Sequence, residues 1–346
     1  MSNPYTLVFG QPPIEFIERT SQAERIVSEF SQERPSNTLN LVTGIRGCGK
    51  TVFITQIANR LAEDKKWVIV NLNPQRDLLP SLAAKLQSDR TLSEWFQEAE
   101  INLQAFGLGI AIKGVPPVHD IEEALIRMLR SIQNHNRRVL ITIDEATNSK
   151  EMRIFASTYQ IFLREQLPVF LLMTGLYHQI DRLRNADGMT FLERAPRTVL
   201  SPLNFSAMVS RYMETLKVNQ DVATRLAKVT KGYSFAFQTV GYFCWENRYD
   251  LERALDLSRD YLYEFAYEKI WSELSGKDRE TVLAIARSAE GKVAETRNIL
   301  NWSANQFNPY RDRLLKGGII SSPGPGLIAF ALPWFDQFAL EKDRTD

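Results

Sequence analysis

The sequence has few of the residues that build disulfide frameworks or metal centres. Among its 346 residues there are only two cysteines, Cys48 and Cys244, and three histidines. Two cysteines alone cannot form a disulfide framework or a metal site, and His119, His135 and His178 show no ligand spacing. We therefore expect reduced thiols, a cytoplasmic protein and no histidine-based metal centre.

Long apolar runs and a strong net charge are also missing. The longest apolar runs, such as Val169 to Met173, are far too short to span a bilayer. The first residues, MSNPYTLVFGQPP, lack a basic segment followed by an apolar one, so no signal peptide is expected there. A net charge of +1 creates no global field, so any surface for nucleic acid must be local and no membrane partner is expected.

What the sequence does have is a glycine-rich stretch, LVTGIRGCGKT, with the spacing G-x-x-x-x-G-K-T. Glycines let several backbone N–H groups approach a triphosphate, a lysine adds charge at its β- and γ-phosphates, and the Thr51 hydroxyl can hold Mg²⁺. A plain glycine turn is the alternative, but an apolar strand before the stretch and an apolar helix face after it favour a phosphate loop. The residues predicted to contact ATP here are Gly44, Ile45, Arg46, Gly47, Cys48, Gly49, Lys50, Thr51 and Val52.

A second informative stretch is RRVLITIDEA. Its apolar part, Val139 to Ile143, is typical of a strand inside a parallel sheet. An acid at the end of such a strand is suited to Mg²⁺ coordination beside a phosphate loop, so Asp144 and Thr51 are the predicted metal ligands. Glu145 is placed to orient and deprotonate the attacking water.

The strand expected around Trp67 lies between these two motifs in the chain, which indicates that the phosphate-loop strand and the acidic strand are not sequence neighbours. A later buried strand ends in Thr174, a candidate sensor of the γ-phosphate or, alternatively, part of a strand-end turn. Arg194 and Arg197 are candidate arginine fingers for a neighbouring subunit, or else surface partners of acids. The predicted catalytic residues are therefore Lys50, Glu145, Thr174, Arg194 and Arg197.

From Asn204 the alternation of strands and helices stops. Helical patterns are expected over 205–216, 219–230, 234–248 and Leu251 to Trp271, and the aromatic residues of GYSFAFQTVGYFCW indicate a packed helix core. An earlier segment, Ile101 to Gly114, is expected to be a hairpin insertion. The fold class expected is an α/β P-loop ATPase domain with a parallel sheet (1–203), a helical lid (204–262) and an α+β winged-helix domain (263–346).

The last domain reads as three helices followed by a hairpin around the PGPG tip, which is typical of a winged helix. The third helix would enter a major groove, with Phe307, Tyr310 and Leu314 in its core stripe. The stem of one further candidate, Arg311, is expected to be packed. The predicted nucleic-acid contacts are Gln306, Asn308, Arg311, Arg313 and Lys316.

Taken together, these motifs resemble those of AAA+ ATPases of the origin-recognition and STAND-related group, often called archaeal-type, with a C-terminal winged helix. GIRGCGKT, LITIDEA, MTGL, FLERAPRTVLSPL and LLKGGII carry the resemblance over nearly the whole chain. IERTSQAERI resembles the N-terminal box of the family, which implies that Ile17 and Arg19 lie near the adenine. The resemblance implies ATP and Mg²⁺ as cofactors and ATP hydrolysis as the activity.

The sequence departs from the family pattern at two places. Ser234 and Phe235 stand where origin-binding relatives carry a lid arginine, and the next arginine after them is Arg248. Thr174 stands at the end of the sensor strand, where asparagine is usual. Slow hydrolysis and a nucleotide that acts as a conformational switch are therefore expected.

Two functions remain open at this point. One is a DNA-associated ATPase of a replication, transposition or mobile-element type, with double-stranded DNA as a partner. The other is a STAND-like signalling or defence switch whose winged helix contacts only protein, as a homo-oligomer or with a protein partner. A P-loop metabolite kinase is disfavoured, because its chemistry has no role for a long helical C-terminal part.

Overall fold

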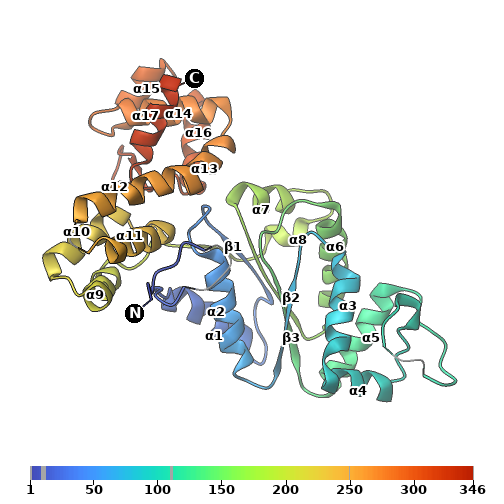
Figure 1. Ribbon diagram of the computed structural model, residues 1–346. Coiled ribbons are helices and arrows are strands. Elements are labelled where there is room, and N and C mark those ends of the chain that lie inside the picture. The colour runs from blue at the N-terminus through green and yellow to red at the C-terminus, as the bar shows by residue number, and fades with distance from the viewer. Residues whose placement is uncertain (1, 9–12, 110–111, 249, 346) are drawn as a thin grey trace. The chain divides into compact units, whose positions relative to one another are not determined.

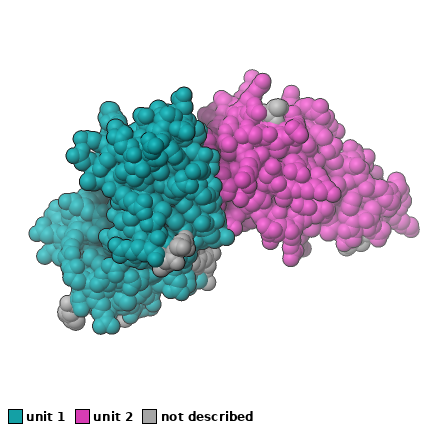
Figure 2. All heavy atoms as spheres, turned by 90° about the horizontal axis from the view of Figure 1, so that it is seen from above, with its two compact units in different colours: residues 1–19, 44–49, 200–346 teal, residues 20–43, 50–199 magenta. Residues whose placement is uncertain are grey.

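The computed structural model of the chain describes residues 2–8, 13–109, 112–248 and 250–345. It divides into two compact units, coloured separately in Figure 2. The α/β unit comprises residues 20–43 and 50–199, and the helical unit comprises residues 1–19, 44–49 and 200–346. The expected domain boundary at residue 203 lies near the last change of unit, between residues 199 and 200, whereas residues 1–19 and 44–49 group with the helical unit.

The α/β unit is built on a five-stranded parallel sheet in the order β2-β3-β4-β1-β5. The phosphate-loop strand β1 pairs with β4, from Leu39 opposite Leu171 to Thr43 opposite Gly175. β4 also pairs with β3, so it separates β1 from the acidic strand in the sheet. The sequence predicted only that a further strand, around Trp67, lies between these two strands in the chain. The strands are β1 (Leu39–Thr43), β2 (Trp67–Leu72), β3 (Arg138–Ile143), β4 (Val169–Gly175) and β5 (Arg197–Val199).

Helices cover both faces of this sheet, with α1 and α2 on one side and α3, α5 and α6 on the other (Figure 1). This is why β1 and β4 are buried along their whole length and read as nearly continuous apolar runs. The helices are α1 (Thr20–Ser31), α2 (Lys50–Ala62), α3 (Leu78–Ser88), α4 (Arg90–Glu98), η1 (Gln104–Phe106), α5 (Ile121–Asn134), α6 (Lys150–Arg164), α7 (Tyr177–Arg184) and α8 (Thr190–Glu193).

The hairpin expected at 101–114 is wrong. The described residues of this segment contain the single 3-10 turn η1 and no strand. The Asn102 side chain explains the irregular path, because its Nδ2 donates to the carbonyl of Val115 at 2.7 Å and its Oδ1 accepts from the N–H of Gln104 at 3.1 Å. Side-chain hydrogen bonds of this kind compete with the regular pairing of a hairpin.

The lid part of the helical unit contains α9 (Phe205–Leu216), α10 (Gln220–Thr230), α11 (Ser234–Glu246) and α12 (Leu251–Leu262). Its core includes Tyr5 from the N-terminal segment, whose ring lies against Gly241 so closely that a Cβ there would be 2.4 Å away. The N–H of Thr6 also donates to Gln238 at 3.1 Å. These contacts fasten the start of the chain to the lid.

The expected helix from Leu251 to Trp271 is present but changes type. α12 passes into a π-helical segment, η2 (Tyr263–Tyr267), and then into α13 (Glu268–Ser272). Periodicity alone could not predict this, because a single π-helical turn is too short for its changed spacing to stand out from the apolar pattern of the helices on either side.

The C-terminal part has the element order predicted for a winged helix. α14 (Gly276–Arg287), α15 (Val293–Leu300) and α16 (Ala304–Lys316) are followed by the antiparallel pair β6 (Ile320–Ser321) and β7 (Ala329–Phe330). An unpredicted helix, α17 (Phe335–Thr345), follows, and its Phe335 and Phe338 are buried in the core. The name winged helix stays a prediction.

Within the described residues, no helix is both long and apolar enough to cross a bilayer.

Candidate nucleotide site

The phosphate loop is shaped by two glycines in the left-handed backbone region. Gly47 has φ of +75° and Gly49 has φ of +90°. Residues with a side chain avoid such angles, and consecutive turns of this kind make a concave nest of N–H groups. Helix α2 begins directly after the loop, at Lys50, so its first free N–H groups and positive end adjoin the nest. The loop therefore fits an anion such as a phosphate.

The acid that ends the third strand lies beside the helix that follows the phosphate loop. Thr51 Oγ1 donates to Asp144 Oδ2 at 2.6 Å. Asp144 follows directly after β3, and Thr51 is in the first turn of α2. The two predicted metal ligands, 93 positions apart in sequence, are thus brought together in the α/β unit.

Thr174, at the end of β4, joins the same cluster. Its hydroxyl donates to Asp144 Oδ1 and accepts from the N–H of Glu145 at 3.3 Å, while its carbonyl accepts from the N–H of Ala146 at 2.7 Å. The side chain is completely buried. Its hydroxyl is thus occupied in orienting the acids, a role the sequence reasoning did not assign to it, and its predicted sensor role stays a prediction.

Glu145 has an unusual backbone conformation. Its φ is +57°, a region that residues with a side chain rarely adopt and that costs about 1 kcal/mol or more. The N–H of Glu145 is held by Asp144 Oδ1 at 3.1 Å as well as by Thr174. The side chain itself is exposed. Strain of this kind persists where a structure fixes a reactive group, so it supports the predicted role of Glu145 as a base.

The donor set around Asp144 fits Mg²⁺. Carboxylate and hydroxyl oxygens are its preferred ligands, and it usually takes one or two from the protein while keeping water and substrate phosphates for the rest. Consistent with that, the described residues contain no group of three or more acids, histidines and cysteines that would form an all-protein metal cage. Thr51 and Asp144 would hold the ion.

The two predicted arginine fingers differ in their surroundings. The Arg197 guanidinium lies over the ring of Tyr177, 4.6 Å from its centroid, and one nitrogen is 4.0 Å from Asp181. Arg194 is exposed at the end of α8, and no ion pair or side-chain hydrogen bond ties it to another described residue. Arg197 thus has a structural role already, whereas Arg194 is available for a partner.

The residues of the N-terminal box reach two different places. Ile17 packs against the lid core. Arg19 donates to the carbonyl of Cys48 in the phosphate loop at 2.9 Å and to that of Ser201 at 2.7 Å. Burial lowers the pKa of its guanidinium, and no described carboxylate forms an ion pair with it. Their predicted contact with adenine stays a prediction, but Arg19 is clearly part of the loop's surroundings.

Sequence reasoning missed two residues of the helical unit that contact the phosphate loop. Tyr233 Oη donates to the carbonyl of Arg46 at 2.8 Å, and Glu273 forms an ion pair with the Arg46 guanidinium at 3.0 Å. The only available signal was that Tyr233 comes just before the position where relatives carry a lid arginine. Nothing in the sequence distinguished Glu273 from other surface acids.

The predicted DNA-contact residues are all on α16. Gln306, Asn308, Arg313 and Lys316 are exposed and Arg311 is half-buried, as expected. Both arginines have partners within the domain: Arg313 pairs with the buried Asp278 at 2.9 Å, and Arg311 pairs with Asp312 at 3.0 Å.

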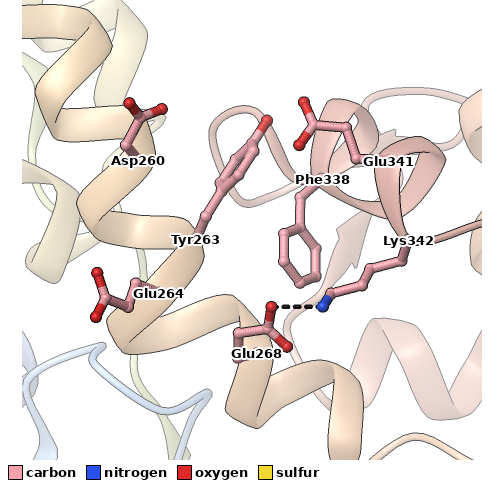
Figure 3. A pocket seen from close by; sticks show the side chains of 7 residues that line it. All are labelled: Asp260, Tyr263, Glu264, Glu268, Phe338, Glu341 and Lys342. Carbon is pink, nitrogen blue, oxygen red and sulfur yellow. Dashed lines mark ion pairs between the residues drawn. The ribbon is translucent and has the colours of Figure 1, made fainter. Parts of the chain in front are cut away.

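A pocket of about 380 Å³ in the helical unit is not a nucleotide site. It lies between the α12–η2–α13 segment and α17 (Figure 3). Four of its lining side chains are acids, and the one lysine, Lys342, pairs with Glu268 at 2.5 Å. Excess negative charge repels phosphates. The residues that line it are Asp260, Tyr263, Glu264, Glu268, Phe338, Glu341 and Lys342.

The sheet order, the phosphate loop and the acid pair that follows the third strand are those of the P-loop ATPase fold. Residues 16–167 match the model of the family described as an ATPase domain predominantly from Archaea. The chain is therefore an ATPase. A second family, described only as a domain of unknown function, matches residues 264–339.

Solved structures share the fold along nearly the whole chain. The Walker-type ATPase PABY2304 of Pyrococcus abyssi superposes with a TM-score of 0.65 at 13% identity, covering 94% of this chain and 96% of that one. The Aeropyrum pernix ORC2 protein, in ADPNP–ADP complexes, gives 0.58 at 13% identity, covering 97% and 98%. Comparison with curated proteins gave no significant match. At such identities the likeness shows the fold alone.

Proposed function

We propose that this chain is a slow, Mg²⁺-dependent ATPase that works as a nucleotide switch and contacts duplex DNA through its C-terminal domain. A cytoplasmic location and a homo-oligomer or protein partner belong to the same proposal. The single observation that carries the nucleotide part is the 2.6 Å contact between Thr51 and Asp144. It joins the helix after the phosphate loop to the end of the acidic strand, although β4 lies between β1 and β3 in the sheet.

Each residue of the site has a role that follows from its position. The N–H groups of the phosphate loop and the Lys50 ammonium bind and orient the phosphates. Glu145 holds the attacking water and takes its proton, while Thr174 keeps Asp144 and Glu145 in place. Mg²⁺, when bound by Thr51 and Asp144, supplies charge that stabilises the phosphoryl oxygens. Catalysis is thus mainly positioning and electrostatic stabilisation.

Two variants test the nucleotide part. Lys50→Ala should abolish ATP binding, because the loop loses its only lysine charge at the phosphates. Glu145→Gln should bind ATP as wild type does but hydrolyse it far more slowly, since an amide cannot take the proton. Nucleotide affinity and single-turnover hydrolysis measure both effects. Unchanged binding and turnover in both variants would rule out this site.

The DNA part is supported by the outward side of α16. It presents the amides of Gln306 and Asn308 beside the cations Arg313 and Lys316. Amide and cationic side chains on an exposed helix are the groups that read base edges and bind phosphates. Because the chain has a net charge of only +1, this local surface rather than a global field would have to provide the attraction.

Fluorescence anisotropy of a labelled duplex tests the DNA part, using Glu145→Gln with Mg²⁺-ATP at low and moderate salt. Binding should weaken as the salt concentration rises. It should also be weaker in Lys316→Ala, because a lost phosphate contact lowers the affinity and reduces the slope of log K against log salt concentration by about one. Lys228→Ala, the same charge change on the exposed side of α10, is the matched control and should bind as wild type does. Absence of binding at both salts would remove DNA from the proposal.

A protein-facing switch is the second candidate, and one specific observation favours it. The ion pairs of Arg313 with Asp278 and of Arg311 with Asp312 neutralise cations on α16. A helix whose charge is balanced within its own domain is better suited to contacting protein than to the phosphate backbone. If the duplex does not bind, this reading becomes the leading one.

A further inference from the structure

The outer face of the phosphate loop is covered by the start of the lid helix α11. Arg46 O accepts from Tyr233 Oη at 2.8 Å, Gly47 O accepts from the N–H of Phe235 at 3.1 Å, and Cys48 O accepts from Ser234 Oγ at 2.9 Å. Three successive loop carbonyls are thus held by three successive lid residues.

Arg19 strengthens this contact from the N-terminal segment. Its Nη2 donates both to Cys48 O at 2.9 Å and to Ser234 Oγ at 3.1 Å. The guanidinium therefore fixes the hydroxyl of Ser234 and the loop carbonyl with one nitrogen. All of these groups belong to the helical unit.

The packing around Gly47 leaves no room for a side chain. A Cβ at this position would lie 2.4 Å from Tyr233 Oη and 3.0 Å from the Cβ of Phe235. Sequence reasoning explains the loop glycines by the approach of the phosphates. For Gly47, the closest neighbours are instead the lid residues, so this glycine is needed for the lid to reach the loop.

This contact has a mechanical consequence. In an anion nest the N–H groups point to the anion, so the carbonyls of the same peptide units point away from it and need donors of their own. A peptide unit is planar and rigid, so a rotation that turns its N–H toward a phosphate must also move its carbonyl. The hydrogen bonds from the lid residues to these carbonyls therefore lengthen or shorten whenever the loop adjusts to a ligand.

The contact continues into the C-terminal domain. Tyr233 and Phe235 belong to the same buried cluster as Tyr267 of η2 and Ile319, and the phosphate-loop residue Ile45 packs against that cluster. The ion pair between Arg46 and Glu273, next to the end of α13, adds a second connection. A conformational change in the phosphate loop would thus be transmitted to the C-terminal core through Tyr233 and through the ion pair between Arg46 and Glu273.

We propose that Tyr233, Ser234 and Arg19 are positioning residues that couple the phosphate loop to the lid and C-terminal domain through the loop's outer carbonyls. The proposal rests on the proposed function, since it requires nucleotide on the loop. The coupling takes the place of a lid arginine, because Ser234 stands at that position and senses the loop backbone instead of the γ-phosphate. Coupling is reciprocal, so contacts that hold the C-terminal domain also set nucleotide affinity.

The test compares two tyrosines that each lose only a hydroxyl. Tyr233→Phe leaves Arg46 O without its donor, and Tyr212→Phe leaves the carbonyl of Phe237, 2.8 Å away inside the lid core, without its donor. The two changes are chemically identical, and both tyrosines are buried. Only the first touches the phosphate loop.

Two readouts separate positioning from stability. Tyr233→Phe should weaken binding of a fluorescent ATP analogue about tenfold, the effect of one lost hydrogen bond to a buried carbonyl. It should also reduce the change that ATP causes in amide hydrogen exchange of α13. Tyr212→Phe should lower the melting temperature while leaving both readouts as in wild type. Glu273→Gln, a surface change, should reduce the exchange response even if Tyr233→Phe folds poorly.

The outcomes distinguish this coupling from the nucleotide site itself. If Lys50→Ala abolishes binding while Tyr233→Phe and Glu273→Gln keep wild-type affinity and exchange response, the coupling is wrong and the site stands. If Lys50→Ala still binds ATP, nucleotide does not sit on the loop and both proposals fail. An equal loss of affinity in Tyr212→Phe would also overturn the coupling, since the effect would then be general destabilisation.

Discussion

Thr174 illustrates how one buried hydroxyl can orient a pair of neighbouring acids. Its hydroxyl donates to Asp144 and accepts from the N–H of Glu145, and its carbonyl accepts from the N–H of Ala146. Since the side chain is fully buried, water cannot replace these contacts if the hydroxyl is removed. Asp144 and Glu145 would then keep their charges but lose their orientation.

Thr174→Val should therefore reduce turnover about 10- to 100-fold, the usual effect of losing a partner that orients a metal ligand. Valine has nearly the same shape, so the fold should survive, and Thr174→Ser should retain most activity. Measuring kcat and KM separately checks the reason, because the loss should be in kcat with ATP affinity nearly unchanged. A valine variant as active as the serine variant would contradict this role.

Cys244 gives a prediction at high pH. Burial in the lid core raises the pKa of its thiol from 9.0 to about 12. Below pH 9 the thiol is protonated in both folded and unfolded chains, so it has no effect on pH dependence there. Between pH 9 and 12 the unfolded chain loses the proton first, so the free energy of unfolding should fall by up to about 1.4 kcal/mol per pH unit from this group.

Urea unfolding of wild type and Cys244→Ala at pH 8 and pH 10.5 measures this contribution. The buried Tyr159, whose pKa is also raised, acts in the same direction in both proteins and cancels in the comparison, whereas Cys244 helps to raise the pKa of Tyr212, so the difference includes that effect of the thiol on Tyr212. The variant should lose less stability than wild type between the two pH values. Equal losses would mean that the thiol is accessible to water in the folded state.

At the scale of elements, α16 shows that an exposed cation is not always free to bind a ligand. Arg313 is about half exposed, yet its partner Asp278 is only 3% exposed and also caps the start of α14 with Ser275. Truncating the arginine would leave a buried carboxylate without its cation. Loss of DNA binding in an Arg313 variant would thus be ambiguous, because it could reflect a destabilised domain.

Arg313→Ala should destabilise the C-terminal domain by about 1–3 kcal/mol, because the partner charge stays buried while the exposed side of the pair is screened by water. Adding Asp278→Asn should recover part of that loss, since the remaining group is then neutral. Thermal unfolding of the two variants and of Asp278→Asn alone completes a double-mutant cycle. Strictly additive effects would show that the pair contributes nothing.

Elements with strong local signals could be predicted from the sequence, and others could not. β3 and β4 contain continuous apolar runs because both faces of the sheet are covered, whereas β1 has the buried polar Asn40 in its middle. That β4 lies between β1 and β3 in the sheet was not predicted. The π-helical segment η2 was not predictable, because it differs from an α-helix by one residue per turn. α17 was missed because its buried Phe335 and Phe338 show their partners only once the domain has folded.

The candidate site was predictable to a similar extent. Lys50, Thr51, Asp144 and Glu145 belong to motifs whose spacing reflects phosphate and metal chemistry, so they could be found in one sequence. The strain at Glu145 and the contact from Thr174 to Asp144 could not, because they depend on which strands are neighbours. The same holds for Tyr233, whose partner on the phosphate loop is 187 positions away.

At the scale of the whole molecule, neither compact unit is a single continuous stretch of the sequence. Residues 1–19 belong with the helical unit because Tyr5 packs into the lid core and Glu15 pairs with Arg211 at 3.0 Å. The phosphate-loop residues 44–49 belong there too, held by Tyr233, Ser234 and Arg19. Sequence reasoning placed both segments in the ATPase domain, since contacts across 200 residues leave no local pattern.

Whether catalysis needs more than one chain is also a question about the whole molecule. Arg194 is exposed with no described ion-pair partner, while Arg197 is held by Tyr177 and Asp181. An arginine that stabilises phosphoryl transfer from a neighbouring molecule must be free to leave its own surface, which favours Arg194. Turnover per chain should then rise with protein concentration.

Mixing two inactive variants tests this directly. Glu145→Gln lacks the base, and Arg194→Ala should lose at least ~100-fold in turnover because the transition-state charge lacks its arginine. In a mixture, the intact Glu145 of one chain can meet the intact Arg194 of the other, so activity should reappear and be highest near equal amounts. Arg197→Ala is the control: it keeps both Glu145 and Arg194, so it should lower the melting temperature but turn over without a second variant. If Arg194→Ala alone turns over normally, each chain works alone and Arg194 is an ordinary surface residue.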